Sequence, residues 1–364
     1  MKIEDKNKKI KLLHGYLTLP AFFPDGTYGV VKSVNSKDLE QINIAGMVTN
    51  TFHLMNKIGI NNIKDLGGIH SLINFNKPMI SDSGGFQVFS MINENSKRGE
   101  IRKNEIIFRE EDGSKLILSP EKCIQMQFAL GTDIIMCLDY CTHPSATVDI
   151  NEKSVDTTIR WAKKCKDEYN KQLKMRKYTE NNRPLIFGII QGANNKNLRK
   201  YCAEELIKIG FDGFGFGGWP LDKDNKLIDD ILQYTAGLMP EGAIKYAMGL
   251  GRPEEIVRCV KMGYNLFDCV IPTREARHTR LYIFNYPVNI NNDNFYKYLR
   301  ILDKEFKKDL EPIDKNCDCE CCKNYSRAYM YHLFKIGDSQ ADRLASIHNL
   351  AFYTKLMEYI RNEK

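Results

Sequence analysis

Polar side chains and glycines stand at the ends of several short apolar runs in this sequence. The set comprises Asp82, Asp139, Gln191, Gly217, Gly218, Met248, Gly249 and Asp268. Carboxylates can serve as nucleophiles and as general acids or bases, and an amide can hold a polar ligand. Each aspartate taken singly has a simpler explanation as a helix N-cap. Three of them at the ends of separate strands would converge on one cavity, so the joint pattern predicts a reactive site.

A second group of residues has the composition of a metal centre. Cys317, Cys319 and Cys322 lie close together, and His348 follows them. Three thiolates and one imidazole complete the tetrahedral shell of a structural zinc site, which leaves no open position for catalysis. Cys321 is a spare cysteine beside this site, and the alternative is a set of unliganded thiols. The spacing favours one structural Zn²⁺ in each chain.

Apolar runs that alternate with amphipathic stretches must position these residues. Seven runs have the pattern of buried parallel strands, at 46–49, 78–81, 133–138, 185–190, 213–216, 246–248 and 266–271. Helical patterns lie between most of them, at 120–130, 151–174, 195–209, 227–238 and 252–262. The alternation predicts an α/β protein of the TIM (β/α)8 barrel type, with its eighth strand near Leu281–Phe284. A Rossmann-like sheet is the alternative, although no G-x-G-x-x-G follows an early strand.

Two segments depart from this alternation. Residues 96–118 alternate apolar and charged side chains around Asp112 and Gly113, which predicts a β-hairpin inserted in the barrel. From about Asn285 onward the chain is charged, has a helical pattern and carries the cysteines. We therefore expect a catalytic barrel at residues 1–284. A zinc-binding helical subdomain at residues 285–364 should pack on it and contribute the last helices.

The overall composition limits the class of protein. With 364 residues and 43% hydrophobic side chains, the chain can build a large globular core. No apolar run approaches the roughly 20 residues of a membrane helix, and the first residues lack the apolar core of a secretory signal. We therefore expect a cytoplasmic protein. Its net charge of +7 suits a nucleic-acid partner, although a solvated lysine-rich surface would explain the charge equally well.

Several segments, in chain order, match the motifs of one enzyme family. They are Ser81–Val88 (S-D-S-G-G-F-Q-V), Asp139–Thr142 (D-Y-C-T), Phe187–Gly192 (F-G-I-I-Q-G), Met248–Gly251 (M-G-L-G), Phe267–Arg274 (F-D-C-V-I-P-T-R) and the cysteine group with His348–Leu350 (H-N-L). Through these residues the chain resembles the queuine/archaeosine tRNA-ribosyltransferases, and specifically the bacterial-type tRNA-guanine transglycosylases. The matches cover nearly the whole sequence.

The resemblance implies a reaction and two roles in it. The enzyme would exchange guanine at the wobble position (34) of tRNAs with a GUN anticodon for a 7-deazaguanine, in queuosine biosynthesis. By similarity Asp268 is the nucleophile that holds the ribose as a covalent intermediate, and Asp82 is the general acid/base. Breaking a base–ribose bond leaves positive charge at C1′, which a carboxylate can stabilise and trap. No catalytic cofactor is expected, because one glycosidic bond replaces another.

The same resemblance assigns a pocket for the base. Its residues are Asp82, Ser83, Phe86, Asp139, Gln191, Gly217, Gly218, Trp219 and Met248. Asp139 would accept hydrogen bonds from guanine, whereas Gln191 and the backbone N–H of Gly218 would donate to its O6. Phe86 and Met248 would enclose the ring from both faces. Core packing is the alternative for Phe86 and Met248, and close strand packing is the alternative for the glycines.

Further residues are assigned to the RNA and to a second subunit. Arg274 and Arg277 match arginines that contact the anticodon beside the target guanine, a role that suits arginine in unstacked RNA loops. Arg280 has no counterpart, and a solvated basic loop explains it equally well. Three residues at helical spacing resemble the homodimer interface of the family, with packing on the barrel as the alternative: Tyr325, Tyr329 and His332.

The sequence departs from the family after Gly218. Because Pro220 has no N–H, the Trp219–Pro220 peptide can present only an acceptor carbonyl, which suits the aminomethyl group of preQ1. Lys223 replaces an expected acidic residue nearby, and Cys141 matches enzymes that use preQ1. The departures at Trp219–Pro220 and Lys223 predict an altered base preference without giving its direction, and Cys141 favours preQ1 as the incoming base. Direct use of queuine is the alternative.

Two other classes of function compete with this interpretation. A non-catalytic tRNA-binding partner subunit would typically lack one of the two catalytic aspartates, and Asp82 and Asp268 are both present. An unrelated barrel hydrolase with paired carboxylates would leave the zinc motif and the base pocket unexplained. The sequence therefore favours the transglycosylase.

Overall fold

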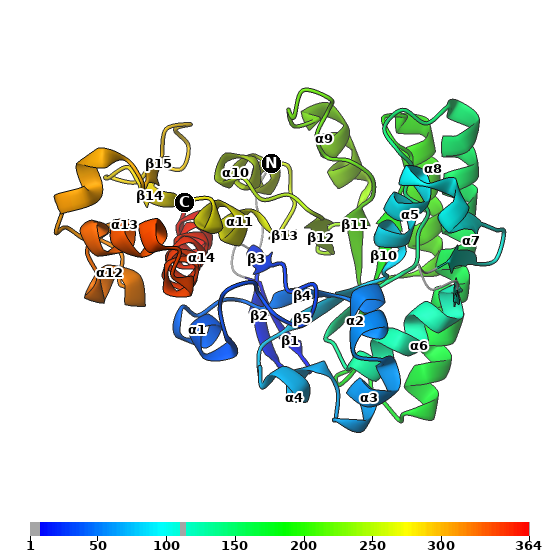
Figure 1. The fold of residues 1–364 in the computed structure, drawn as a ribbon. Coiled ribbons are helices and arrows are strands. Elements are labelled where there is room, and N and C mark those ends of the chain that lie inside the picture. The colour runs from blue at the N-terminus through cyan, green and yellow to red at the C-terminus, as the bar shows by residue number, and fades with distance from the viewer. Residues whose placement is uncertain (1–7, 110–113, 364) are drawn as a thin grey trace.

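The computed structural model describes residues 8–109 and 114–363, and its centre is a barrel of parallel strands (Figure 1). Neighbouring strands pair in parallel throughout the eight-stranded sheet. In spatial order these strands are β3 (Ala21–Pro24), β13 (Leu266–Cys269), β12 (Ile244–Ala247), β11 (Gly213–Phe216), β10 (Leu185–Ile190), β9 (Ile134–Met136), β5 (Met79–Asp82) and β4 (Met47–Asn50). The predicted barrel is confirmed.

The eighth strand was predicted in the wrong place. It is β3, which pairs with β13 and approaches β4 through a parallel bridge between Asp25 and Val48. The run at Leu281–Phe284 belongs instead to β14 (Arg280–Phe284), which pairs with β15 (Tyr296–Arg300) in a separate antiparallel sheet. Because β3 already occupies the free edge of β13, no edge of the barrel is left for β14. The sequence hid β3 because it is four residues long and prolines stand before and within it.

Helices connect most of the barrel strands and cover the outside of the sheet. They are α1 (Ser36–Gln41), α2 (Thr51–Lys57), α3 (Ile60–Asp65), α4 (Ile69–Ile73), α5 (Gly85–Glu94), α6 (Pro120–Leu130), α7 (Val148–Met175), α8 (Lys196–Ile209), α9 (Asp229–Leu238), α10 (Pro253–Lys261) and α11 (Ile271–Arg277). Local sequence sets their ends. Helix α6 begins after Ser119, whose hydroxyl accepts the Lys122 N–H, and ends at Gly131 with a left-handed φ of 74°.

The insertion between α5 and α6 differs from the predicted hairpin. It is an antiparallel sheet of three strands, β6 (Gly99–Ile101), β7 (Ile106–Arg109) and β8 (Lys115–Leu118). Strands β7 and β8 make the expected pair, although the turn residues Asp112 and Gly113 lie outside the described residues. Strand β6 was missed because a three-residue strand has almost no periodicity of its own.

The C-terminal part is less uniformly helical than predicted, because it also contains β15 and the 3₁₀ helix η2 (Lys304–Lys308). Its α-helices are α12 (Glu320–Asn324), α13 (Arg327–Ile336) and α14 (Ser339–Asn362). Figure 1 shows α12 and α13 gathered at one side of the barrel. Helix α14 packs against α11 and β3, so the end of the chain supports the strand that closes the barrel. Within residues 8–109 and 114–363, no helix has the length and apolar character required to cross a bilayer.

A buried aspartate anchors the end of the barrel at which the strands begin. Asp133 accepts the backbone N–H of His14 at 2.7 Å and that of Met79 at 2.8 Å. His14 joins β1 (Lys9–Leu12) to β2 (Gly15–Thr18), so this carboxylate ties the N-terminal hairpin to the barrel. The rings of His14 and His70 stack 3.5 Å apart beside it, only 14° from parallel. Near-parallel rings cannot aim both nitrogen lone pairs at one ion, so the group is a hydrogen-bonded anchor rather than a metal centre.

We predict that Asp133→Asn lowers the free energy of unfolding by about 2 kcal/mol at neutral pH. Burial alone would raise the pKa of Asp133, but hydrogen bonds from the two imidazoles lower it from 3.8 to about 2. A depressed folded-state pKa contributes stability above the unfolded value, and that stability is lost as the pH falls from 3.8 through 2. Urea unfolding should therefore show the same deficit at pH 7 and pH 4.5. A deficit that already shrinks above pH 4.5 would contradict the assignment, and Asp230→Asn at an exposed ion pair serves as control.

Candidate active site

The structure brings the predicted strand-end residues to one end of the barrel. Asp82 ends β5, Asp268 is the next-to-last residue of β13, and Gln191 follows β10. Asp139 lies three residues beyond β9. Because all eight strands are parallel, their C-terminal ends share one mouth. Loops and short helices from these strand ends then carry the other assigned residues.

Asp82 is held by three donors from neighbouring segments. Its Oδ2 accepts the amide Nδ2–H of Asn50 at 2.6 Å, and its Oδ1 accepts the backbone N–H groups of Thr51 and Gly84 at 3.2 and 3.0 Å. Burial, together with the smaller effect of the nearby charges of Asp25 and Asp268, raises the pKa of Asp82 to about 7 despite these bonds. This carboxyl group can therefore be protonated near neutral pH, as a general acid must be.

Asp268 has one oxygen fixed and one free. Its Oδ1 accepts the phenol of Tyr246 at 2.8 Å and the backbone N–H of Gly249 at 2.7 Å. Among the described residues, no hydrogen bond to its Oδ2 is recorded. Burial raises the pKa of Asp268 to about 6, although both hydrogen bonds lower it. The side chain is thus ionised above this pH.

Asp139 and Gln191 form a buried pair. The amide Nε2–H of Gln191 donates to Asp139 Oδ2 at 2.6 Å, and burial raises the pKa of Asp139 to about 6. The pair leaves Asp139 Oδ1 as an acceptor and the second amide hydrogen of Gln191 as a donor. A side chain at Gly217 would meet Gln191 Nε2 at 2.6 Å, so glycine is required there for space. Gly218 has a φ of 99°, which also favours glycine.

The remaining base-pocket candidates lie at different depths. Ser83 is buried and its hydroxyl accepts the Gly85 N–H, which shapes the start of α5. Met248 is half-buried and lies against Gly215 in the barrel interior. Phe86 and Trp219 are both 45% exposed, with ring centroids 5.8 Å apart. The proposed enclosure of the base between Phe86 and Met248 stays a prediction.

A rim cavity of about 250 Å³ adjoins these two aromatic rings. Besides Phe86 and Trp219, its lining includes Cys141, His143 and Glu94. The carbonyl oxygen of Pro220 accepts the Ile228 N–H at 3.1 Å, whereas no bond to the Trp219 carbonyl is recorded among the described residues. The rim therefore combines aromatic surface with one unused acceptor.

The assigned arginines lie on α11, directly after the strand that carries Asp268. Arg274 is exposed, whereas Arg277 is half-buried and its Nη1 has no hydrogen-bond partner among the described residues. Arg280 instead forms an ion pair with Glu275 at 3.0 Å. Lys223 is exposed on the loop between β11 and α9. Only the first two arginines are thus free to meet a ligand at the mouth.

The four predicted metal ligands form one cluster. Ligand atoms of Cys317, Cys319, Cys322 and His348 all lie within 4.8 Å of one another. The Nε2–H of His348 donates to the Tyr282 carbonyl at 2.7 Å, so its Nδ1 lone pair faces the sulfurs, 3.2 Å from Cys322 Sγ. Three thiols and an oriented imidazole fit a tetrahedral metal ion. Cys321 is buried in the neighbouring core and lies outside the cluster.

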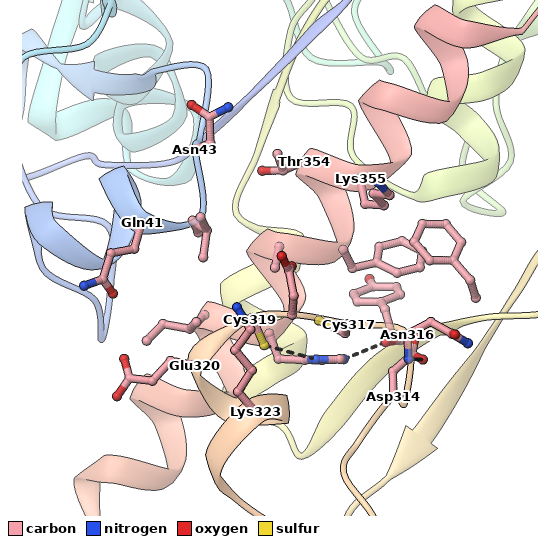
Figure 2. Close-up of a pocket in the computed structure, with 18 of the residues that line it drawn as sticks. Gln41, Asn43, Asp314, Asn316, Cys317, Cys319, Glu320, Lys323, Thr354 and Lys355 are labelled. Carbon is pink, nitrogen blue, oxygen red and sulfur yellow. Dashed lines mark hydrogen bonds between the residues drawn. The ribbon is translucent and has the colours of Figure 1, made fainter.

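The metal cluster borders a large surface cavity, shown in Figure 2. Cys317, Cys319 and His348 are among the residues that line this cavity of about 670 Å³. Close to the cluster, the rings of Tyr325 and Tyr329 stack 5.3 Å apart. The expected single helical face is wrong in detail, because Tyr325 precedes α13 and only Tyr329 and His332 lie on that helix. Both are exposed, so they do not pack on the barrel.

Sequence reasoning missed several residues that shape the mouth. Asn50 and Tyr246 position the two aspartates, and Asp25 follows the strand that was not predicted. Arg199 is 1% exposed and donates to the carbonyls of Ala193, Ile190 and Gly217, which fixes the loops after β10 and β11. The position of Asn50 at the end of an apolar run was the one signal available. The others depend on contacts between distant segments.

Comparisons with known proteins relate the chain to one family. The family model described as queuine tRNA-ribosyltransferase matches residues 5–363. The queuine tRNA-ribosyltransferase of Psychrobacter sp. (strain PRwf-1) is 40% identical over 350 residues, covering 96% of this chain and 87% of the relative. Those of Acinetobacter baylyi and Acinetobacter baumannii (strain ACICU) are 40% and 39% identical over 355 residues, covering 97% of this chain and 86% and 88% of the relatives. The chain therefore belongs to the queuine tRNA-ribosyltransferase family.

Proposed function

We propose that the chain is a tRNA-guanine transglycosylase, a pentosyltransferase that replaces guanine at the anticodon wobble position with a 7-deazaguanine. The observation that carries the proposal is the pairing of Asp268, with a free oxygen, and Asp82, with a raised pKa, at one barrel mouth. A non-catalytic partner subunit would have no use for two such carboxyl groups in one site. Arg274 and the unpaired Arg277 Nη1 then contact the anticodon loop.

The reaction proceeds as two displacements at C1′ of the target ribose. Asp268 Oδ2 forms a bond to C1′ while the C1′–N9 bond breaks and its electron pair leaves with guanine. Asp82 gives a proton to the departing base. The incoming base then attacks C1′, the Oδ2–C1′ bond breaks, and Asp82 recovers a proton from the new base. Each half-reaction leaves the enzyme as it began.

Asp139 and Gln191 select the base. Asp139 accepts hydrogen bonds from the N–H groups of a guanine-like edge, and the second amide hydrogen of Gln191 donates to O6. The Gly218 N–H donates to the same oxygen. A buried acceptor and donor that are left unpaired by a wrong base disfavour it strongly, so adenine should be rejected.

The incoming base is preQ1 in this proposal. The unused Trp219 carbonyl can accept a hydrogen bond from an aminomethyl group, whereas the Trp219–Pro220 peptide offers no donor. The rim cavity beside Trp219 favours one alternative, since its roughly 250 Å³ could hold the larger substituent of queuine. Both bases share the guanine-like edge that Asp139 and Gln191 read.

Exchange of labelled guanine into tRNA tests the activity and the base together. We expect incorporation of guanine, with preQ1 competing at lower concentration than queuine or preQ0. Queuine as the strongest competitor would favour the alternative base. A protein that binds tRNA tightly and incorporates no guanine would be the non-catalytic partner instead.

The raised pKa values predict a narrow pH optimum. The first displacement needs Asp268 ionised and Asp82 protonated, so kcat/KM should fall below pH 6 and again above pH 7. The measurement is the rate of guanine exchange from pH 5 to 9 at subsaturating tRNA. A rate that keeps rising through pH 8 would contradict Asp82 as the acid of the first step.

The metal ion is zinc in this proposal, and the assembly is a homodimer. Three thiolates and one imidazole suit zinc, and a closed shell gives it a structural role in the C-terminal subdomain. The half-buried ring of Tyr325 and the exposed ring of Tyr329 adjoin Leu310, which is 84% exposed, and together they offer an apolar contact for a second copy. The protein would act in the cytoplasm, where tRNA is modified.

A further inference from the structure

Asp25 occupies a position at the barrel mouth that the proposed reaction does not yet use. In β3, side chains alternate, so Ala21, Phe23 and Asp25 share one face. Ala21 and Phe23 pack in the barrel interior with Leu266 of β13. The side chain of Asp25 therefore lies on the inward face of its strand. Asp268 lies on the inward face of β13 in the same way, two residues after Leu266.

The register of β3 and β13 places the two carboxylates close together. Phe23 lies opposite Asp268, and Pro24 lies opposite Cys269. Asp25 therefore lies on the strand next to that of Asp268 and two residues closer to the mouth. The Cα atoms of the two aspartates are roughly 8 Å apart. Burial raises the pKa of Asp268 and of Asp82, and the charge of Asp25 raises both further. Asp25 therefore lies beside both groups of the proposed mechanism.

The turn that carries Asp25 is fixed to the next strand. The Gly26 N–H donates to Val48 O at 2.7 Å, and the Asn50 N–H donates to Thr27 O at 3.1 Å. A side chain at Gly26 would meet the Met47 sulfur at 2.8 Å, so this close approach requires glycine. The Thr27 hydroxyl donates to Asp25 Oδ1 at 2.5 Å. No hydrogen bond to Asp25 Oδ2 is recorded among the described residues, which leaves a preorganised acceptor.

The order of strands indicates which part of the substrate this acceptor meets. The base-reading residues Asp139, Gln191 and Gly218 follow β9, β10 and β11. Asp25 lies on the opposite arc, between β13 with Asp268 and β4 with Asn50. If C1′ lies at Asp268 and the base extends toward β9–β11, the sugar lies toward β3. Within an RNA chain the 2′-hydroxyl is the free hydroxyl of that sugar, and it is adjacent to C1′.

We propose that Asp25 accepts a hydrogen bond from the 2′-hydroxyl of the target nucleotide and makes the enzyme discriminate RNA from DNA at that position. The inference rests on the proposed attack of Asp268 at C1′. A 2′-hydroxyl is the group by which proteins distinguish RNA from DNA at a given site. A bond from it to a partly buried carboxylate strengthens in the low dielectric of the mouth. Asp25 is then a specificity-determining residue.

The test compares two anticodon stem-loops that differ in one atom, with ribose or 2′-deoxyribose at the target guanosine. Guanine exchange is measured for the wild type, Asp25→Ala and Thr27→Val on both. The preference for ribose is the ratio of kcat/KM on the ribose substrate to kcat/KM on the 2′-deoxyribose substrate. This ratio should be about 10- to 100-fold higher for the wild type than for Asp25→Ala, which is the value of one hydrogen bond to a charged group. Comparing enzymes on the same substrate pair cancels the intrinsic reactivity of the deoxyribose. Thr27→Val keeps the Asp25 carboxylate but removes the hydroxyl that fixes its Oδ1. This variant should lose part of the preference for the ribose substrate.

A matched control and an independent readout separate the outcomes. Asp224→Ala removes the same charge from an exposed loop after β11 and should leave the ribose preference unchanged. An Asp25→Ala enzyme with the wild-type preference would overturn the proposal, as would a variant whose pH profile shifts without any change in preference. Failure of the proposed function would show separately, as absence of an Asp268-dependent covalent adduct in the wild type. Thermal melts verify that each variant is folded.

Discussion

Asp268→Asn should abolish guanine exchange, with a loss in kcat on the order of 10⁴ or more, as for other covalent nucleophiles. Oδ1 accepts two hydrogen bonds, from the Tyr246 phenol and the Gly249 N–H, and only a carbonyl oxygen can replace it there. The asparagine amide group must therefore take the place of Oδ2, the oxygen that attacks C1′. An amide nitrogen at that point is not a nucleophile. The covalent RNA adduct, seen as a shifted band under denaturing conditions, should disappear with the activity.

Two comparisons make this result specific to the reacting atom. Tyr246→Phe removes one of the two bonds to Oδ1 but keeps the nucleophile, so it should slow exchange and still form the adduct. Asp268→Asn should melt at the same temperature as the wild type or higher, because burial raises the pKa of Asp268 and the ionised carboxylate is destabilising when no ligand is bound. Exchange at the wild-type rate in Asp268→Asn would exclude the covalent mechanism.

Removal of the metal ion should have the second large effect, on stability rather than on chemistry. The ligands come from the start of α12 with the turn before it and from the middle of α14, and the His348 Nε2–H is bonded to β14. One ion would thus add a link among three elements that hydrogen bonds and an ion pair already connect. Cys319→Ser, or treatment with a strong chelator, should lower the free energy of unfolding by several kcal/mol. The measurements are the bound metal per chain and the melting temperature before and after chelation.

Cys321 offers a matched control for this experiment. It is a neighbouring cysteine and fully buried, yet it packs in the core and lies outside the ligand cluster. Cys321→Ser should keep the full metal content, with only the cost of a hydroxyl in an apolar site. If the metal-free protein retains its melting temperature, the ion has no structural role.

In the proposed mechanism, the two arcs of the barrel mouth contact different parts of the substrate. In this mechanism, the residues that follow β9, β10 and β11 distinguish guanine-like bases, and those on the arc of β13, β3 and β4 lie beside the sugar. Asp82 lies at the junction, held by Asn50 from the sugar arc. In this proposal, one proton donor between the two arcs serves both the leaving base and the incoming base. We expect base preference and sugar preference to be separable by mutation.

The local pattern of the chain was sufficient for much of the site. Asp82 and Gln191 could be placed because strand periodicity ends at those residues, and parallel strand ends must meet. The metal cluster could be placed because its three cysteines are neighbours in sequence and need little folding to converge. A changed base pocket was inferred from Pro220, whose missing N–H is a property of the residue itself, and preQ1 was favoured because of Cys141.

The sequence by itself determined which segments form most of the strands and helices, through their periodicity, and which residues stand at the ends of those segments. It also determined the donor atoms of the metal cluster. The tertiary structure decided which strand closes the barrel, that Asn50 and Tyr246 hold the two aspartates, and that Asp25 lies beside Asp268. The physical reason is that short strands such as β3 carry little pattern, and their place depends on register with segments hundreds of residues away. Such contacts are set by the closing of the whole barrel and not by any local sequence.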